Sequence, residues 1–111
     1  MKTNVLYFIF LISFGSLTAQ KIYSTNQSYK ADFKVFVVKN EYQADLKVYK
    51  VSRPYEAKKN VGLWYFTNMS YDSDKKIYFC ENEYEADIKV FFVDYKYQAK
   101  WKNSEKKFLL Y

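Results

Sequence analysis

An internal repeat runs through the chain from residue 21 onward, and it limits the architectures that the chain can adopt. Its most regular position is a tyrosine that recurs in steps of 13, 13, 16, 13 and 13 residues. We call these six residues the tyrosine column: Tyr29, Tyr42, Tyr55, Tyr71, Tyr84 and Tyr97. The chain is therefore expected to fold as repeated copies of one short unit.

Other positions of the unit repeat together with the tyrosine. Seven residues before it lies an apolar column: Ile22, Val35, Val48, Trp64, Ile77 and Val90. Six residues before it lies an aromatic column: Tyr23, Phe36, Tyr49, Tyr65, Tyr78 and Phe91. Two residues after it lies a small residue: Ala31, Ala44, Ala57, Ser73, Ala86 and Ala99. Agreement in several columns at once excludes chance similarity.

The first 19 residues have the three-part pattern of a secretory signal peptide. Lys2 precedes an almost wholly apolar segment at 5–14, and the mostly small or polar residues 15–19 lead to an expected cleavage after Ala19. The unbroken apolar run is far shorter than the roughly 20 residues of a membrane-spanning helix, so no transmembrane segment is expected after cleavage. The prediction is one domain over residues 20–111 of a secreted or periplasmic protein.

The single cysteine and the positive net charge limit how the fold can be stabilised and which partners it can bind. Cys80 is the only cysteine, so no internal disulfide can form, and it stands where other units have Val or Thr. We expect a small buried side chain there and not a reactive thiol. The formal net charge of +6 is spread through the repeats, which favours a solvated surface. The expected partners are an anionic envelope polymer, a glycan or another protein, and intracellular nucleic acid is not expected.

Each unit predicts a β-strand followed by a short connector. Runs such as 47–51 and 76–80 are rich in Val, Ile, Phe and Tyr, which favours strands. The connectors open on a polar or charged residue three positions before the tyrosine, contain no glycine and carry Pro54 directly before Tyr55. These features favour a single helical turn over a tight hairpin. An antiparallel β-meander or a small barrel is the alternative.

The expected fold is mainly β, a pseudo-symmetric 13-residue repeat of seven short strands joined by single helical turns. The expected strands are 22–25, 34–38, 47–51, 63–67, 76–80, 89–93 and 108–111. Two lysine-rich loops, 58–61 and 102–107, interrupt the repeat and are expected to be exposed. Closure of the strands on themselves would leave no free edge, so loss of residues 108–111 is expected to unfold or aggregate the protein.

The sequence resembles the septoil-knot domain proteins, a family of small bacterial proteins. The resemblance covers nearly all of residues 21–111 and is carried by segments 40–49, 62–66, 93–99 and 110–111. It implies a closed, pseudo-symmetric, β-rich repeat whose backbone forms a seven-crossing torus knot, a topology that is nearly absent from proteins. The resemblance carries no activity, cofactor or catalytic residue over to this chain.

The sequence lacks the residue types that common metal, cofactor and phosphate-binding sites require. The chain has no histidine and one cysteine, which excludes the usual zinc, haem and iron–sulfur sites and removes the commonest general base. Residues 20–111 contain one glycine, Gly62, which excludes a glycine-rich phosphate loop. We therefore expect no enzyme activity, no cofactor and no metal ion. A hydrolase built from dispersed carboxylates is the alternative.

An Asp-x-Lys pattern recurs in four units: Asp32/Lys34, Asp45/Lys47, Asp74/Lys76 and Asp87/Lys89. On an extended segment the two side chains of each pair share a face. Clustered carboxylates could hold Ca²⁺. Because each aspartate has a lysine two residues on, we expect surface ion pairs, each worth well under ~1 kcal/mol.

The sequence also offers candidates for a binding surface. Exposed rings of the tyrosine column could stack on sugars or bases, but their repetition beside a small residue favours packing over the neighbouring unit. Better candidates are tryptophans and basic residues at or near the breaks in the repeat: Trp64, Trp101, Arg53, Lys58, Lys59, Lys102, Lys106 and Lys107. Trp64 has an equal alternative as a core residue because it lies in the apolar column.

The preferred hypothesis is a secreted, non-enzymatic, compact repeat domain with a structural or binding role at the cell envelope or outside the cell. It depends on the signal peptide, the missing catalytic residue types and the regular repeat. A lectin-like or envelope-polymer-binding module that uses the two tryptophans and the basic loops is the second hypothesis. A cryptic hydrolase is the third.

Overall fold

The structure is a computed structural model that describes residues 20–111, so the predicted signal peptide lies outside the described residues. The strands are β1 (Lys21–Ser24), β2 (Phe33–Val37), β3 (Leu46–Lys50), β4 (Leu63–Phe66), β5 (Lys75–Phe79), β6 (Ile88–Phe92) and β7 (Lys100–Trp101). The first six agree with the predicted strands to within one residue at each end. Short runs rich in Val, Ile, Phe and Tyr are therefore a sufficient local signal for these six strands.

Single 3₁₀ turns follow the first six strands, as the sequence predicted. They are η2 (Ser28–Lys30), η3 (Glu41–Gln43), η4 (Pro54–Glu56), η5 (Ser70–Asp72), η6 (Glu83–Glu85) and η7 (Lys96–Gln98). A typical turn is entered and left through extended backbone, with φ of −120° at Asn40 and −81° at Ala44. Among residues 20–111, positive φ occurs only at Lys59 and Gly62, so the turns need no glycine.

Strands β1 to β6 close into a parallel barrel. The ring runs β4-β1-β5-β2-β6-β3, and a pairing between β3 and β4 closes it. Each of these pairings is parallel, so the alternative antiparallel meander is wrong. Every strand of the ring is hydrogen-bonded on both sides, which leaves the ring without a free edge.

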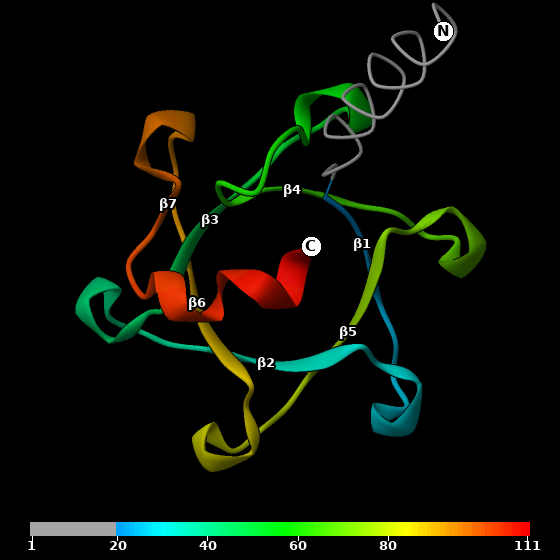
Figure 1. Cartoon of the computed structure of the whole chain (residues 1–111), viewed down its shortest axis with the longest axis horizontal. Helices are drawn as coiled ribbons and strands as arrows, with labels where there is room; N and C mark the ends of the chain where they lie inside the picture. Colours follow the sequence, from blue (N-terminus) through cyan, green and yellow to red (C-terminus); the bar gives the residue numbers. More distant parts are fainter. Residues whose placement is uncertain (1–19) are drawn as a thin grey trace, which may run out of the picture.

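Consecutive strands are mostly not neighbours in this ring. Strand β5 lies between β1 and β2, and β6 lies between β2 and β3. The connections therefore pass over an intervening strand, and Figure 1 shows them projecting outward around the ring. We call the six projecting loops with their turns η2 to η7 the arms.

The apolar column supplies most of the barrel core, and Phe33, Leu46, Ile88 and Leu110 complete the buried cluster. All six side chains of the column are fully buried, and Trp64 is the largest of them. The aromatic column lies one residue later on each strand, so it points outward, where its members are half-buried. Cys80 is also buried and its thiol donates to the Val35 carbonyl, 3.4 Å away, which confirms the predicted small buried side chain.

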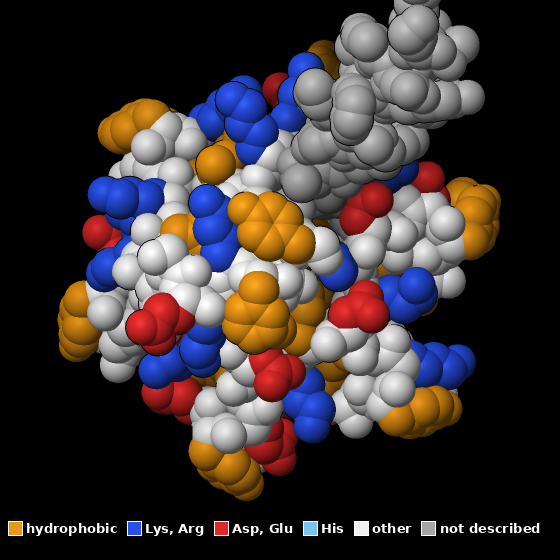
Figure 2. Space-filling model, in the orientation of Figure 1, with side chains coloured by type: hydrophobic (Ala, Val, Ile, Leu, Met, Phe, Trp, Pro, Cys, Tyr) orange, Lys and Arg blue, Asp and Glu red, His pale blue; other side chains and the backbone are white. Residues whose placement is uncertain are grey.

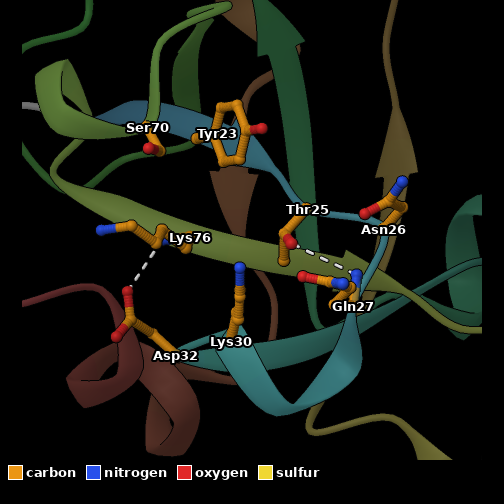
Figure 3. A pocket seen from close by; sticks show the side chains of 8 residues that line it. All are labelled: Tyr23, Thr25, Asn26, Gln27, Lys30, Asp32, Ser70 and Lys76. Atoms are coloured by element: carbon orange, nitrogen blue, oxygen red, sulfur yellow. Dashed lines mark hydrogen bonds between the residues drawn. The ribbon is translucent and has the colours of Figure 1, made fainter.

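The Asp-x-Lys pattern joins neighbouring strands and does not form the predicted ion pairs. Asp32 Oδ2 accepts from the backbone N–H of Lys76 at 2.7 Å, and the Asp32 N–H donates to the Lys76 carbonyl at 2.7 Å (Figure 3). The same two-point latch recurs in three further pairs: Asp45 with Lys89, Asp74 with Lys21, and Asp87 with Lys34. Among the described residues, none of these aspartates pairs with the lysine two residues on.

Two of the four lysines of the pattern pair with glutamates instead. Lys47 Nζ lies 3.5 Å from Glu41 Oε2, and Lys89 Nζ lies 3.4 Å from Glu83 Oε2. The glutamate in each pair stands six residues earlier, in the preceding 3₁₀ turn. The carboxylates of the pattern thus bind backbone N–H groups of neighbouring strands. The ammonium groups of Lys47 and Lys89 bind glutamates in the more exposed turns.

The C-terminal segment differs from the prediction. Residues 108–111 do not form a strand, because η8 (Ser104–Leu110) is a 3₁₀ helix that includes residues 108–110. The seventh strand is β7, which pairs antiparallel with β3. Figure 1 shows η8 lying across the ring, and Leu110 is only 2% exposed. The helix therefore covers the barrel with an apolar side chain instead of extending the sheet.

Gly62 is required where the chain enters β4. Its φ is +94°, and a Cβ at this position would clash with the backbone oxygen of Lys47. Gly62 also accepts a backbone hydrogen bond from Tyr49 at 2.9 Å. This glycine therefore permits the close approach of β3 and β4 that completes the ring.

A search of residues 20–111 for helices that could span a membrane finds none of sufficient length and hydrophobicity.

Candidate functional site

Trp64, one of the predicted site residues, belongs to the core. It is fully buried on β4, and its ring makes an edge-on contact with Phe66 at a centroid distance of 6.0 Å. Its alternative interpretation as a core residue is therefore the one that the structure supports. It offers no surface to a ligand.

Trp101 joins the two lysine-rich loops. Its indole N–H donates to the backbone oxygen of Asn60 at 3.0 Å and to Asn60 Oδ1 at 3.1 Å. Asn60 in turn donates through Nδ2 to the Lys107 carbonyl at 2.9 Å. The sequence predicted that the first loop, 58–61, is exposed. Asn60 is buried, so this prediction is wrong for part of the loop. The half-buried Trp101 therefore links the loop at Asn60 to the C-terminal segment through hydrogen bonds.

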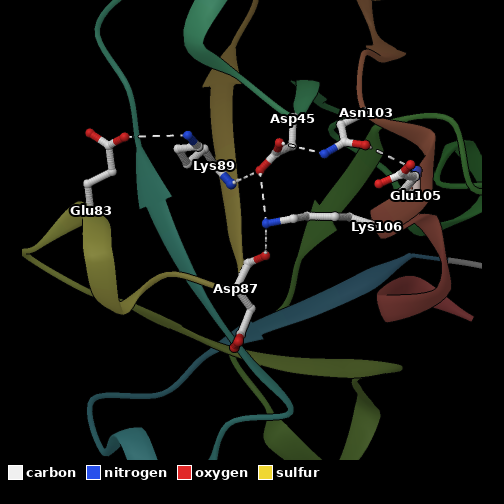
Figure 4. A network of polar contacts seen from close by, with 7 residues as sticks. All are labelled: Asp45, Glu83, Asp87, Lys89, Asn103, Glu105 and Lys106. Atoms are coloured by element: carbon white, nitrogen blue, oxygen red, sulfur yellow. Dashed lines mark hydrogen bonds and ion pairs between the residues drawn. The ribbon is translucent and has the colours of Figure 1, made fainter.

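Two of the predicted site lysines, Lys102 and Lys106, also bind the C-terminal segment to the barrel units. Lys106 Nζ donates to the Asp87 carbonyl at 2.8 Å and lies 3.7 Å from Asp45 Oδ2 (Figure 4). Lys102 Nζ donates to the Glu41 carbonyl at 3.2 Å. Lys107 is half-buried within η8. Lys102 and Lys106 therefore hold the C-terminal segment against the barrel and are poorly placed to bind a ligand.

The remaining predicted lysines line a groove between two arms. Lys58 and Lys59 follow η4, and Lys96 from η7 faces them across a volume of about 550 Å³. Val61 and Leu63 supply apolar surface, and Tyr55 stands beside it. We call this the basic groove. Arg53 is exposed at the N-terminus of η4, outside the groove lining.

Positive charge dominates the basic groove. Within residues 20–111, Lys58, Lys59 and Lys96 have no ion pair with a carboxylate. The one lining carboxylate, Glu56, caps its own turn by accepting the Arg53 backbone N–H at 3.2 Å. Uncompensated ammonium groups beside an aromatic ring and an apolar wall favour an anionic ligand with some apolar surface.

Sequence reasoning missed Lys96 because no local signal links it to the first lysine-rich loop. The two segments are separated by more than 30 positions along the chain. They meet because β3 contacts both β4 and the η7 turn. Only the order of strands around the ring could reveal this neighbour.

The tyrosine column is exposed, so the predicted packing over the neighbouring unit is wrong. Each of these tyrosines is the middle residue of a 3₁₀ turn, and its exposed fraction ranges from 63% at Tyr55 to 85% at Tyr71. Figure 2 shows hydrophobic side chains at the ends of the arms, with charged side chains between them. The turns project from the barrel, so their central side chains have little to pack against.

Two observations concern metal-ligating side chains and the single thiol of the described residues. No group of three or more His, Cys, Asp or Glu side chains in residues 20–111 is placed to hold a metal ion. Burial raises the pKa of the Cys80 thiol, which keeps the thiol protonated and unreactive at neutral pH.

Comparisons with known proteins give one match. A family model described as the 7(1) septoil knot domain matches residues 19–102. No curated protein matches the chain, and no solved structure matches it. The matched range includes all seven strands and ends before η8 begins.

Proposed function

The chain belongs to the septoil knot domain family, and from this premise we propose that it is an exported, non-enzymatic domain that binds anionic polymers of the cell envelope or the extracellular space. The family match identifies a scaffold, and a fold by itself does not specify a function, so the function must be argued from the surface. The predicted signal peptide supports export. The basic groove supports the binding role.

The basic groove is the observation that carries this proposal. It gathers Lys58, Lys59 and Lys96 from two arms around apolar surface, and no carboxylate of the described residues neutralises them. A single exposed ion pair contributes little, about 0.2–1 kcal/mol. A polymer with many charges can engage all three lysines at once, and this favours a polymer over a small anion.

Sedimentation with charged beads tests the proposal. Phosphocellulose and carboxymethyl-cellulose resins present phosphate and carboxylate on the same backbone without uronic acid units, and plain cellulose is the uncharged control. The groove variant replaces three lysines: Lys58→Gln, Lys59→Gln and Lys96→Gln. Three lost ion pairs predict about tenfold weaker retention near 0.15 M salt. Comparison of the two charged beads identifies which anionic group is preferred.

A charge-matched variant separates specific binding from the general attraction of a basic protein. It removes the same charge from lysines outside the groove: Lys39→Gln, Lys75→Gln and Lys100→Gln. This variant should bind as the unaltered protein does. Equal loss in both variants would leave only nonspecific basic adhesion and would refute the groove as a site.

We also propose that the backbone is a seven-crossing torus knot built on the 13-residue repeat. The ring order supports this, because β1, β2 and β3 make one circuit and β4, β5 and β6 interleave with them in a second. The equal placement of the tyrosine column in the six 3₁₀ turns supports a common unit. Two interleaved circuits are the path that such a knot requires.

A further inference from the structure

A second hollow lies on another side of the ring, between the η2 and η5 arms. It has a volume of about 430 Å³, within the range of small-molecule sites. Figure 3 shows Tyr23 on one side of it and the Lys30 side chain reaching up from the opposite side. None of the residues that line the basic groove lines it. We call it the polar hollow.

The polar hollow is lined by side chains with free hydrogen-bonding capacity. Asn26 and Gln27 each present an amide with donors and an acceptor. Lys30 and Lys76 present ammonium groups. In the part of the chain that the structure describes, none of these four side chains has a hydrogen-bond partner or an ion pair, and the Lys30 ammonium lies 6.0 Å from the centroid of the Tyr29 ring. Mixed donors and acceptors around one space match the hydroxyl groups of a sugar.

Tyr23 gives the hollow an aromatic wall. It lies on β1 between two hydrogen-bonded neighbours, β4 and β5, and it is half-buried. A ring held by a strand loses little conformational freedom on binding. The tyrosines at the ends of the arms lack such support. The apolar face of a pyranose ring is a suitable partner for this wall.

The charges in the hollow indicate an acidic sugar. Two lysines, Lys30 and Lys76, and a single carboxylate, Asp32, line the hollow. One oxygen of that carboxylate is already engaged by the Lys76 backbone N–H at 2.7 Å. The hollow therefore has an excess of positive charge and fixed donors, which favour a ligand carboxylate.

From these contacts we propose that the polar hollow binds a uronic acid unit of an acidic polysaccharide. Tyr23 packs against the sugar ring, Asn26 and Gln27 bind its hydroxyl groups, and Lys30 binds its carboxylate, with the charge of Lys76 adding to the positive potential. The site is independent of the basic groove, so it stands even if the groove does not bind polymer.

Titration of the full protein with trigalacturonic acid tests this proposal, with neutral galactotriose and a sulfated galactotriose as comparison ligands. Isothermal calorimetry gives the affinity, and NMR chemical shifts of backbone amides locate the ligand. We expect at least tenfold tighter binding of trigalacturonic acid than of galactotriose, with the largest shifts around Asn26, Gln27 and Lys30. Equal affinity for the two, or tighter binding of the sulfated sugar, would overturn the uronic acid assignment.

Variants assign the binding to one surface. The hollow variant Asn26→Ala/Gln27→Ala/Lys30→Gln should lose at least tenfold in affinity. A control on the η3 arm, Asn40→Ala/Gln43→Ala, alters amides at exposed positions of another arm and should bind normally. The groove variant with Lys58, Lys59 and Lys96 replaced should also retain trigalacturonic acid. Loss in the groove variant with retention in the hollow variant would refute the hollow as the site.

Discussion

Asp45 makes more contacts than the other latching aspartates. It is 7% exposed, and besides the latch to Lys89 it accepts from Asn103 Nδ2 at 3.3 Å (Figure 4). Its backbone oxygen also accepts from the N–H groups of Lys102 and Asn103. The aspartate repeats in four units, but among the described residues only the carboxylate of Asp45 receives further side-chain donors from the C-terminal segment.

Asp45→Asn is expected to lower the free energy of unfolding by about 1–3 kcal/mol, because one carboxylate oxygen becomes an N–H₂ donor that faces other donors. Asp87→Asn is the matched control. Asp87 is exposed, and an asparagine there can still accept the Lys34 N–H while its amide faces water, so the change should stay within about 0.5 kcal/mol. Equilibrium urea unfolding measures both, and equal losses would contradict this view of Asp45.

The arms and η8 show how similar short helices serve different purposes. The 3₁₀ turns of the arms contain no buried residue and hold their tyrosines in solvent. Helix η8 instead buries Leu110 in the core cluster, and the Leu110 carbonyl accepts from Gln20 Nε2 at 3.1 Å. The two ends of the described chain therefore meet at the barrel.

Deletion of residues 108–111 is expected to lower the melting temperature sharply or to cause aggregation, although these residues form no strand. Loss of a buried leucine alone costs about 2–5 kcal/mol. Deletion of Tyr111 alone is the control, because this residue is 65% exposed and its loss should leave the melting temperature unchanged. Thermal melts with sedimentation velocity measure both. A truncated protein that remains monomeric with an unaltered melting temperature would show that η8 is dispensable.

At the scale of the whole molecule, the order of the strands both closes the ring and brings distant segments together at the two surface sites. The chain passes twice around the barrel, so segments from its two halves alternate and meet between the arms. The basic groove lies between η4 and η7, and the polar hollow lies between η2 and η5. Both are therefore assembled from segments that are distant in the sequence.

Pulling the molecule by residues 20 and 111 in an optical trap tests the proposed knot. A fully extended chain would span about 3.3–3.6 Å per residue. A knotted chain should stop short of this length, because the tightened knot retains part of the backbone. An unknotted protein of equal length, held by the same handles, is the control. Extension to the full length would exclude the knot.

The sequence by itself determined the local structure of this protein. The apolar column identified the six buried side chains of the barrel layer, and the polar, glycine-free connectors identified the 3₁₀ turns. These features depend on alternation along a strand and on the backbone of a few adjacent residues. Both can therefore be read within one unit.

Only the tertiary structure decided what each unit meets. The parallel ring order, the Asp–Lys latches, the exposure of the tyrosine column and the placement of Lys96 beside Lys58 all depend on contacts between distant units. The two ends of each latch, for example, lie 44 or 53 positions apart. Since every unit carries nearly the same pattern, no unit specifies which other unit becomes its neighbour, and that choice requires closure of the whole ring.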